Sequence, residues 1–273
     1  MIDAHFHSWL LSRADYGWLT PALPAIYRDV SIADWQAQAS AHDVKAGVLV
    51  QAAPTEAETQ WLLTQAQQHP SVLGVVGWAD LLAPDAPTRI QALAASPKLK
   101  GLRPMLQDIA DPDWILQAAL APALQTMSDL GLVLDALIKP FHLPRLLTLA
   151  ARYPALAIVI DHAAKPDIAA GQWEPWASDL ARVAAQTGAV CKISGLLTEA
   201  GPQPHPDAAQ RWATHVLQVF GEDRVMWGSD WPVLELAGSY SAWWQASRRL
   251  SANLSEAGSQ ALYSGTARRV YRL

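Results

Sequence analysis

The sequence predicts a single domain over residues 1–273, an α/β fold in which eight parallel strands form a (β/α)8 barrel. Eight short, almost continuously apolar runs recur along the chain, as in strands that are buried on both faces. Stretches of helical composition fill most gaps between them, and such alternation indicates a parallel sheet. A doubly wound open sheet is the alternative, but no glycine-rich dinucleotide turn follows the first run. No Ser/Gly-rich linker divides the chain.

The strands are expected, in chain order, at residues 2–5, 46–51, 73–78, 99–104, 131–137, 156–162, 189–194 and 224–230. The helical segment that opens at Ser31 carries Asp34 three residues on, which is typical of a capping box. The segment after the fourth strand contains Pro122, which we expect to kink or split it. Gly131 follows this segment and suits a helix terminus.

Composition and charge disfavour several functional classes. Apolar residues make up 51% of the 273 residues and charged residues 16%, so the chain can build a large core and disorder is not expected. A net charge of −5 without a basic run argues against nucleic acid or an anionic membrane surface as a partner. The one cysteine, Cys191, lies in an apolar run and is expected to be a buried structural thiol. No signal peptide precedes the first strand and no run is long enough to span a membrane, so we expect a cytoplasmic protein. No pattern predicts its oligomeric state.

Polar side chains follow most of the predicted strands. In barrels of this class the catalytic groups lie at the C-terminal ends of strands and in the loops that follow. A barrel with a purely structural role would need few such groups, so these ends predict an active site. The residues concerned are His5, His7, Gln51, Trp78, Asp80, Arg103, Asp135, His162, Lys192, Ser194 and Asp230.

The first strand ends in the sequence His5-Phe6-His7. Because side chains alternate along a strand, the two histidines share one face, with Asp3 on the same side. Metal binding, proton transfer and a structural role are all compatible with this pair.

Alternation on two later strands predicts partners for these histidines. On the sixth strand it places His162 on the face of Ile160 and leaves Asp161 opposed. On the eighth strand Asp230 shares a face with Gly228. If these faces point inward, three imidazoles and one carboxylate meet at the barrel mouth.

Such a ligand set suits one divalent metal, zinc or a similar ion, with room left for water. Each residue also has a structural interpretation, since a single strand-end histidine is commonly a hydrogen-bonded structural residue. The sequence GSDWP is also typical of a turn in which Asp230 caps a helix. Taken together, His5, His7, His162 and Asp230 favour a functional site. The remaining histidines are expected to be structural or exposed: His42, His69, His142, His205 and His215.

Six segments in this sequence resemble a known family: IDAHFHSW, VVGWADL, GLRPMLQD, IDHAAKP, CKISGL and FGEDRVMWGSDWPV. They are similar to the amidohydrolase-2 group of the amidohydrolase superfamily, and within it to sugar-lactone hydrolases of the L-fuconolactonase and L-rhamnonolactonase type. The resemblance spans essentially the whole chain. It implies a (β/α)8 barrel, catalytic or metal-binding roles for His5, His7, His162 and Asp230, and substrate contact by Arg103.

The resemblance also limits the metal content. A two-metal site in the wider superfamily needs a lysine from the fourth strand and a further histidine from the fifth. Here those strands end in Arg103 and in the sequence LDAL. We therefore expect one divalent metal, or activity without a metal.

Hydrolysis of a lactone needs an activated water and stabilisation of a tetrahedral oxyanion. Asp230 is the expected general base. The three histidines would hold a Lewis-acidic metal. Without a metal, protonated imidazoles and Arg103 would stabilise the oxyanion.

Aromatic and polar side chains near the strand ends are candidate substrate contacts. Trp18, Trp78 and Trp231 could stack on a sugar ring, although sealing of the core is an equally good interpretation of each. The same two interpretations apply to Trp9. Gln51 and the weaker candidates Asp80, Lys165, Lys192 and Tyr240 could bind hydroxyl groups. The connection at residues 8–30 is long for a barrel, and we expect a lid or binding element there.

Three functions remain open on the sequence. The first is hydrolysis of a sugar (aldono-)lactone such as L-fucono- or L-rhamnonolactone, or of a dicarboxylate lactone. The second is metal-dependent, non-oxidative decarboxylation, which proteins of the same superfamily perform with a similar ligand set. The third is a non-catalytic carbohydrate-binding barrel.

Overall fold

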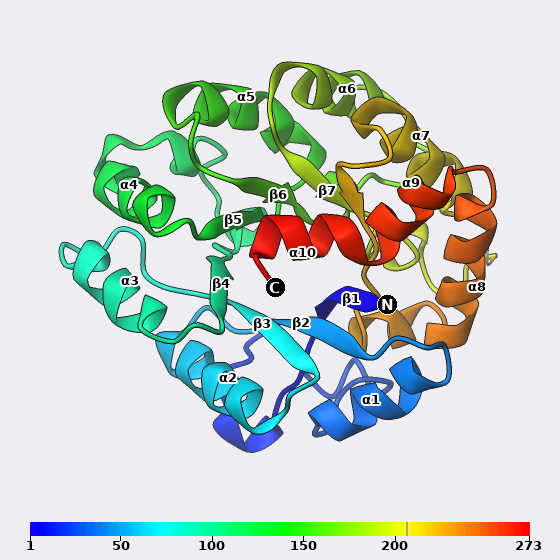
Figure 1. Cartoon of the computed structure of the whole chain (residues 1–273), viewed down its shortest axis with the longest axis horizontal. Helices are drawn as coiled ribbons and strands as arrows, with labels where there is room; N and C mark the ends of the chain where they lie inside the picture. The colour runs from blue at the N-terminus through cyan, green and yellow to red at the C-terminus, as the bar shows by residue number, and fades with distance from the viewer. Residues whose placement is uncertain (206) are drawn as a thin grey trace.

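The computed structural model describes residues 1–205 and 207–273, which form a barrel of eight parallel strands (Figure 1). Each strand pairs with the next along the chain, in the order β1 (Ile2–Phe6), β2 (Ala46–Val50), β3 (Val72–Gly77), β4 (Leu99–Leu102), β5 (Val133–Ala136), β6 (Ile158–Ile160), β7 (Val190–Lys192) and β8 (Val225–Met226). Backbone hydrogen bonds join β1 to the segment after β8: the Asp230 N–H donates to His5 O at 2.8 Å, and the His7 N–H donates to Trp231 O at 2.8 Å. The predicted barrel is confirmed.

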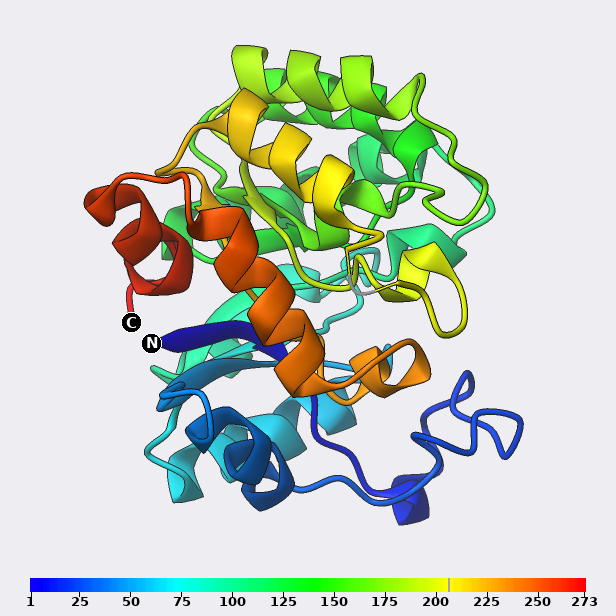
Figure 2. The same cartoon turned by 90° about the vertical axis from the view of Figure 1, so that its right-hand side faces the viewer.

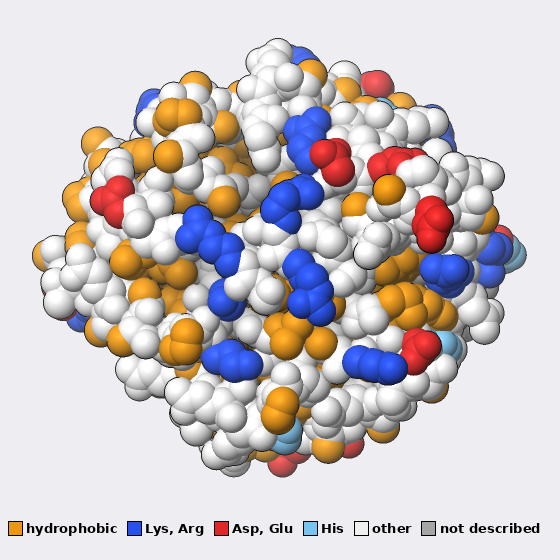
Figure 3. Space-filling view, viewed as in Figure 1, with side chains coloured by type: hydrophobic (Ala, Val, Ile, Leu, Met, Phe, Trp, Pro, Cys, Tyr) orange, Lys and Arg blue, Asp and Glu red, His pale blue; other side chains and the backbone are white. Residues whose placement is uncertain are grey.

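Helices surround the strands and also cover one end of the barrel. They are α1 (Ile32–Ser40), α2 (Glu56–Gln68), α3 (Ala86–Ala94), α4 (Ala121–Leu130), α5 (Leu143–Arg152), α6 (Trp176–Gln186), α7 (Gln210–Phe220), α8 (Tyr240–Ser251), α9 (Glu256–Gln260) and α10 (Thr266–Tyr271). Figure 1 shows α10 lying across the barrel end at which both termini lie. Lys and Arg side chains gather over this end (Figure 3). Within the described residues, no helix combines the length and apolar character needed to cross a membrane.

Local sequence signals act as expected. Ser31 caps α1 with a capping box, because its Oγ accepts from the Asp34 N–H at 3.1 Å while its own N–H donates to Asp34 Oδ2 at 2.8 Å. Gly131 ends α4 in the left-handed conformation, with φ of 65°. The segment that contains Pro122 is split into short 3-10 turns followed by α4. Pro122 lies in the first turn of α4, where its missing N–H is not needed.

The barrel interior is filled by a layer of small apolar side chains. Ile2, Ala4, Met226 and a valine from most of the other strands form one buried cluster with Ala267 and Tyr271 of α10. The carboxyl ends of the strands lie at the end opposite to α10. There, in Figure 2, the loops that follow the strands extend to the right.

β1 departs from simple alternation, and this changes where its acidic residue points. The register with β2 shifts between Asp3 and Phe6, which indicates a bulge. Asp3 faces the surrounding helices, and its Oδ2 accepts from Trp35 Nε1 at 3.0 Å and from the Tyr240 hydroxyl at 3.2 Å. The expectation that Asp3 shares the face of His5 and His7 is therefore wrong, and the weak substrate candidate Tyr240 is a buried structural residue.

β6 also differs from the prediction. Val159 belongs to the interior cluster and Ile160 to the outer core, so Asp161 points inward, opposite to the expected face. His162 reaches the site because the chain then turns through four consecutive left-handed residues, from His162 (φ 52°) to Lys165 (φ 51°). Non-glycine residues adopt this conformation at an energetic cost, which is typical of functional segments.

Candidate active site

A cavity of about 240 Å³ lies at the mouth of the barrel, at the carboxyl ends of the strands. Its lining includes four of the residues at the predicted strand ends: His7, Arg103, His162 and Asp230. His5 lies beneath them and is fully buried. The structure thus brings together the residues that the sequence singled out, from strands far apart along the chain.

The three imidazoles converge on one carboxylate oxygen. Oδ1 of Asp230 lies 3.3 Å from His7 Nε2, 3.6 Å from His5 Nε2 and 3.9 Å from His162 Nε2. The Nε2 atoms of His5 and His7 are 3.3 Å apart. Val50 O, 2.8 Å from His7 Nδ1, can only accept a hydrogen bond, so that nitrogen carries a proton. In the neutral His7 ring Nε2 is then an acceptor that faces the Asp230 carboxylate oxygen, also an acceptor, and a shared proton or a metal cation would satisfy both.

Two glycines make room for these rings. A side chain at Gly195 (φ +67°) would place a Cβ 2.6 Å from His162 Nδ1. At Gly228 the same atom would lie 2.8 Å from His5 Cβ. Ser194 holds the same ring, with its Oγ 2.9 Å from His162 Nδ1.

Burial sets the protonation state of the site. It lowers the pKa of His162 to about 4, and together with Lys192 it lowers the pKa of His5 well below its usual range. Burial raises the pKa of the Asp230 carboxyl, but His162, His7 and His5 outweigh it, so that the pKa lies below its usual range. His5 and His162 are therefore neutral at pH 7. These lowered pKa values disfavour protonated His5 and His162 as groups that stabilise an oxyanion, and they favour Arg103 as the cation for that role.

A buried layer of charges supports the site from below. Lys192 Nζ lies 2.5 Å from Asp135 Oδ2 and 3.0 Å from Asp161 Oδ1. Asp161 Oδ1 lies 3.5 Å from His5 Nδ1. From the closed end of the barrel, the Tyr271 hydroxyl reaches both Asp135 oxygens at 2.9 and 2.8 Å. These charged groups connect α10 to the imidazole of His5.

The three charged residues of this layer are fully buried, so their ionisation depends on one another. Burial raises the pKa of Asp135 to about 6, a value at which the carboxyl is ionised at neutral pH. Burial also raises the pKa of Asp161, but Lys192, His5 and Arg103 outweigh it, and the pKa lies well below its usual range. The layer thus holds two carboxylates with Lys192 between them.

Arg103 is held at the cavity wall by a small network. Its Nη1 lies 3.3 Å from Asp161 Oδ2 and 3.4 Å from His5 Nε2. Its Nη2 donates to the backbone carbonyl of Gln51, and Gln51 Nε2 donates to Arg103 O at 2.8 Å. Gln51 does not line the cavity. Its contacts are those of a residue that positions Arg103, whereas we expected it to contact substrate.

The predicted tryptophans divide into two groups. Trp18 lines the cavity and is anchored by its Nε1, which donates to Ala52 O at 2.7 Å. Trp231 is buried, with its Nε1 donating to Glu235 Oε1 at 2.7 Å, and Trp78 is half-buried. Neither of these two lines the cavity. Their positions favour the packing role that the sequence left open.

Several lining residues were not among the predicted contacts: Ala52, Met105, Gln107, Asp108, Leu137 and Val233. Met105, Gln107 and Asp108 belong to the segment GLRPMLQD, so extending the prediction past Arg103 within this motif would have found them. Lys165, a weak candidate, also lines the cavity. The loop at residues 8–30 contributes Trp18, as expected of a binding element.

Residues 2–273 match the family described as Amidohydrolase. The chain belongs to this family. It is 47% identical to an L-fucono-1,5-lactonase of Burkholderia ambifaria over 245 residues, which cover 89% of this chain and 84% of the relative. An L-fucono-1,5-lactonase of Burkholderia multivorans is 34% identical over 100% of this chain and 96% of its own. A crystal structure of an amidohydrolase from Burkholderia multivorans with bound zinc superposes with a TM-score of 0.94 at 34% identity, covering 100% of this chain and 99% of that chain.

The donor set of this amidohydrolase fits a divalent cation. Tetrahedral zinc with bonds of about 2.0–2.2 Å has ligands about 3.3–3.6 Å apart. The separations among His5 Nε2, His7 Nε2 and Asp230 Oδ1 are 3.3, 3.3 and 3.6 Å. Arg103 Nη1 also lies 3.4 Å from His5 Nε2. A cation bound to this nitrogen therefore requires the guanidinium to give up the contact.

Proposed function

We propose that this amidohydrolase opens the ring of a sugar lactone, with L-fucono-1,5-lactone as the first substrate to test. The observation that carries the proposal is the convergence of the Asp230 carboxylate and the Arg103 guanidinium on one cavity of about 240 Å³. This volume is below the range of about 300–1,000 Å³ that is usual for larger ligands and suits a single sugar ring. The names of the two curated relatives support the choice of substrate.

In the proposed mechanism, Asp230 accepts a proton from water as the water oxygen attacks the lactone carbonyl carbon. The carbonyl π electrons move to oxygen, and Arg103 stabilises the resulting oxyanion. Collapse of the tetrahedral intermediate re-forms the carbonyl and breaks the bond to the ring oxygen. Asp230 returns its proton to that oxygen, which gives the open hydroxy acid.

His5, His7 and Asp230 would hold one divalent metal ion, with His162 beside them. When bound, such an ion would lower the pKa of the attacking water and polarise the carbonyl. This chemistry suits a base whose own pKa is low, because Asp230 stays ionised throughout the neutral range but is weakly basic. Neutral His5 and His162 are the protonation states that metal ligation requires.

The test is acid release, measured with a pH indicator, from a panel containing L-fucono-1,5-lactone, L-rhamnonolactone and a dicarboxylate lactone. Asp230→Asn should lower kcat/KM by about 10²–10⁴-fold, the usual contribution of a general base. The control is Asp43→Asn, which changes a carboxyl that is 78% exposed and should not alter kcat/KM. Elemental analysis of wild type and His7→Asn tests the metal separately. Absence of acid release from every lactone would refute the proposal, and release of CO2 from an aromatic carboxylic acid would favour a decarboxylase.

A further inference from the structure

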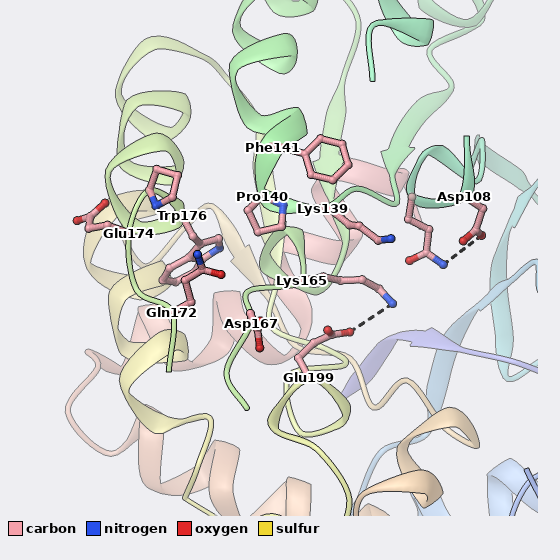
Figure 4. A pocket seen from close by; sticks show the side chains of 12 residues that line it. Asp108, Lys139, Pro140, Phe141, Lys165, Asp167, Gln172, Glu174, Trp176 and Glu199 are labelled. Atoms are coloured by element: carbon pink, nitrogen blue, oxygen red, sulfur yellow. Dashed lines mark hydrogen bonds and ion pairs between the residues drawn. The ribbon is translucent and has the colours of Figure 1, made fainter. Parts of the chain in front are cut away.

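A second cavity adjoins the catalytic one. Its volume is about 620 Å³, more than twice that of the catalytic cavity. The two cavities share Gln107, Asp108 and Lys165 as wall residues, so they adjoin at the barrel mouth. Figure 4 shows the walls of the second cavity, which come from the segments after β4, β5, β6 and β7.

The lining of the second cavity combines charged and amide side chains with the rings of Pro140, Phe141, Pro175 and Trp176, and its carboxyl groups outnumber its ammonium groups. Lys139 and Lys165 extend side by side toward the part of the cavity where Asp108 lies (Figure 4). Lys165 Nζ lies 3.3 Å from Glu199 Oε1, and in the part of the chain that the structure describes Lys139 has no ion-pair partner. Other carboxyl and amide groups complete the lining: Asp167, Glu174, Gln107 and Gln172. Four carboxyl groups against two ammonium groups disfavour an anionic ligand, whereas alternating donors and acceptors suit hydroxyl groups.

An exposed phenyl ring is part of the lining of this cavity. Phe141 is 50% exposed, more than any other large apolar side chain in the described residues. It lies on the 3-10 turn Pro140–His142, directly after β5, and its ring centroid is 4.1 Å from that of His142. An apolar ring held beside hydrogen-bonding groups is the combination that binds the C–H face and the hydroxyl edge of a sugar.

We propose that the second cavity is a subsite for a glycosyl unit, and that the preferred substrate is a glycosylated aldonolactone. This inference rests on the proposed function and deepens it. The lactone ring occupies the catalytic cavity next to Asp230, and the attached neutral sugar extends past Lys165 to Phe141. The reaction is the same ring opening with water, and the glycosidic bond stays intact.

The experiment compares monosaccharide aldonolactones with lactones made by oxidising the reducing end of disaccharides that differ in linkage position. At least one glycosylated lactone should have a KM about three- to tenfold below that of its monosaccharide parent, the range expected for one aromatic contact. Phe141→Ala should remove this advantage and leave kcat and KM for the parent unchanged. Phe141→Trp should retain the advantage, and Lys139→Gln should reduce it.

Leu130→Ala is the matched control, because Leu130 is a comparably exposed apolar side chain, 41% exposed, at the end of α4 and outside the cavity. Turnover of the monosaccharide lactones with weaker or absent turnover of every glycosylated one would overturn the inference and leave the proposed function intact. Equal changes for parent and glycosylated substrate in Phe141→Ala would also overturn it. If no lactone of either kind is hydrolysed, the proposed function itself fails.

Discussion

Lys192→Met tests the buried charge layer, because it removes the one ammonium group that lies between two buried carboxylates. Lys192 has no exposed side-chain surface, and neither have Asp135 and Asp161, its partners at 2.5 and 3.0 Å. Methionine has a similar length and volume, so the variant removes the charge without leaving a large cavity. The expected effect is therefore electrostatic.

The magnitude follows from the contacts of the two carboxylates. Removing one partner of a buried ion pair destabilises a protein by about 3–5 kcal/mol. For a chain of this length that corresponds to a fall in Tm of about 6–20 °C. Asp161 retains Arg103 Nη1 at 3.3 Å, whereas in the described residues the cation of Asp135 is Lys192. The double variant Lys192→Met with Asp135→Asn should therefore regain part of the loss.

The assay is denaturation by urea and by heat, followed by circular dichroism, for wild type, the single variant and the double variant. Lys45→Met is the control, since Lys45 is 79% exposed and pairs with Asp43 at 3.5 Å. Such surface pairs contribute about 0–1 kcal/mol. The reasoning is refuted if Lys192→Met shifts the midpoint no more than Lys45→Met does, or if the double variant is less stable than Lys192→Met.

Two further predictions concern a buried acid and a glycine. Burial raises the pKa of Glu58 from 4.5 to about 7, although its carboxyl accepts hydrogen bonds from the Ala52 and Ala53 N–H groups. Between these two pH values the folded state therefore keeps a proton that the unfolded state releases. The free energy of unfolding should fall by at most about 3 kcal/mol as the pH rises through this range, and Glu58→Gln should not show this fall. The prediction is contradicted if the urea midpoints of wild type and variant differ by the same amount at pH 5 and at pH 8. Gly195→Ala places a methyl 2.6 Å from His162 Nδ1 at φ +67°, and we expect at least about a tenfold loss of kcat/KM with about 1–2 kcal/mol of strain. Gly188→Ala, with nothing within 4 Å of the added atom, is the control in the same kinetic assay, and equal effects of the two changes would show that the space beside His162 is not needed.

Much of the fold and part of the site could be predicted from the sequence. The alternation of apolar runs and helical segments was enough for the barrel, because parallel strands buried on both faces leave that pattern. Strand ends identified His5, His7, Arg103, His162 and Asp230. These groups lie together because the carboxyl ends of all strands in a barrel meet at one face.

The alternation rule fails where the backbone leaves the regular strand conformation. The bulge on β1 separates Asp3 from His5, and the left-handed turn that begins after Asp161 brings His162 into the site beside the inward-pointing Asp161. No short-range pattern in the sequence predicts either deviation. The sequence also does not show which aromatic side chains near strand ends line a cavity. Trp231 is turned away from the cavity by its contacts in the folded chain, among them the hydrogen bond to Glu235.

Tyr271 places a constraint on how the chain acquires its structure during synthesis. Its hydroxyl, near the end of α10, completes the hydrogen bonds of Asp135, while the segment after β8 closes the barrel against β1. During synthesis, the site residues His5, His7, His162 and Asp230 leave the ribosome before Tyr271 does. At that stage the chain still lacks the hydroxyl that reaches Asp135 from the closed end of the barrel. Domains ordinarily fold as units while they are being synthesised, and here the interior stays incomplete until α10 has emerged. Activity should therefore appear only after α10 (Thr266–Tyr271) has left the exit tunnel.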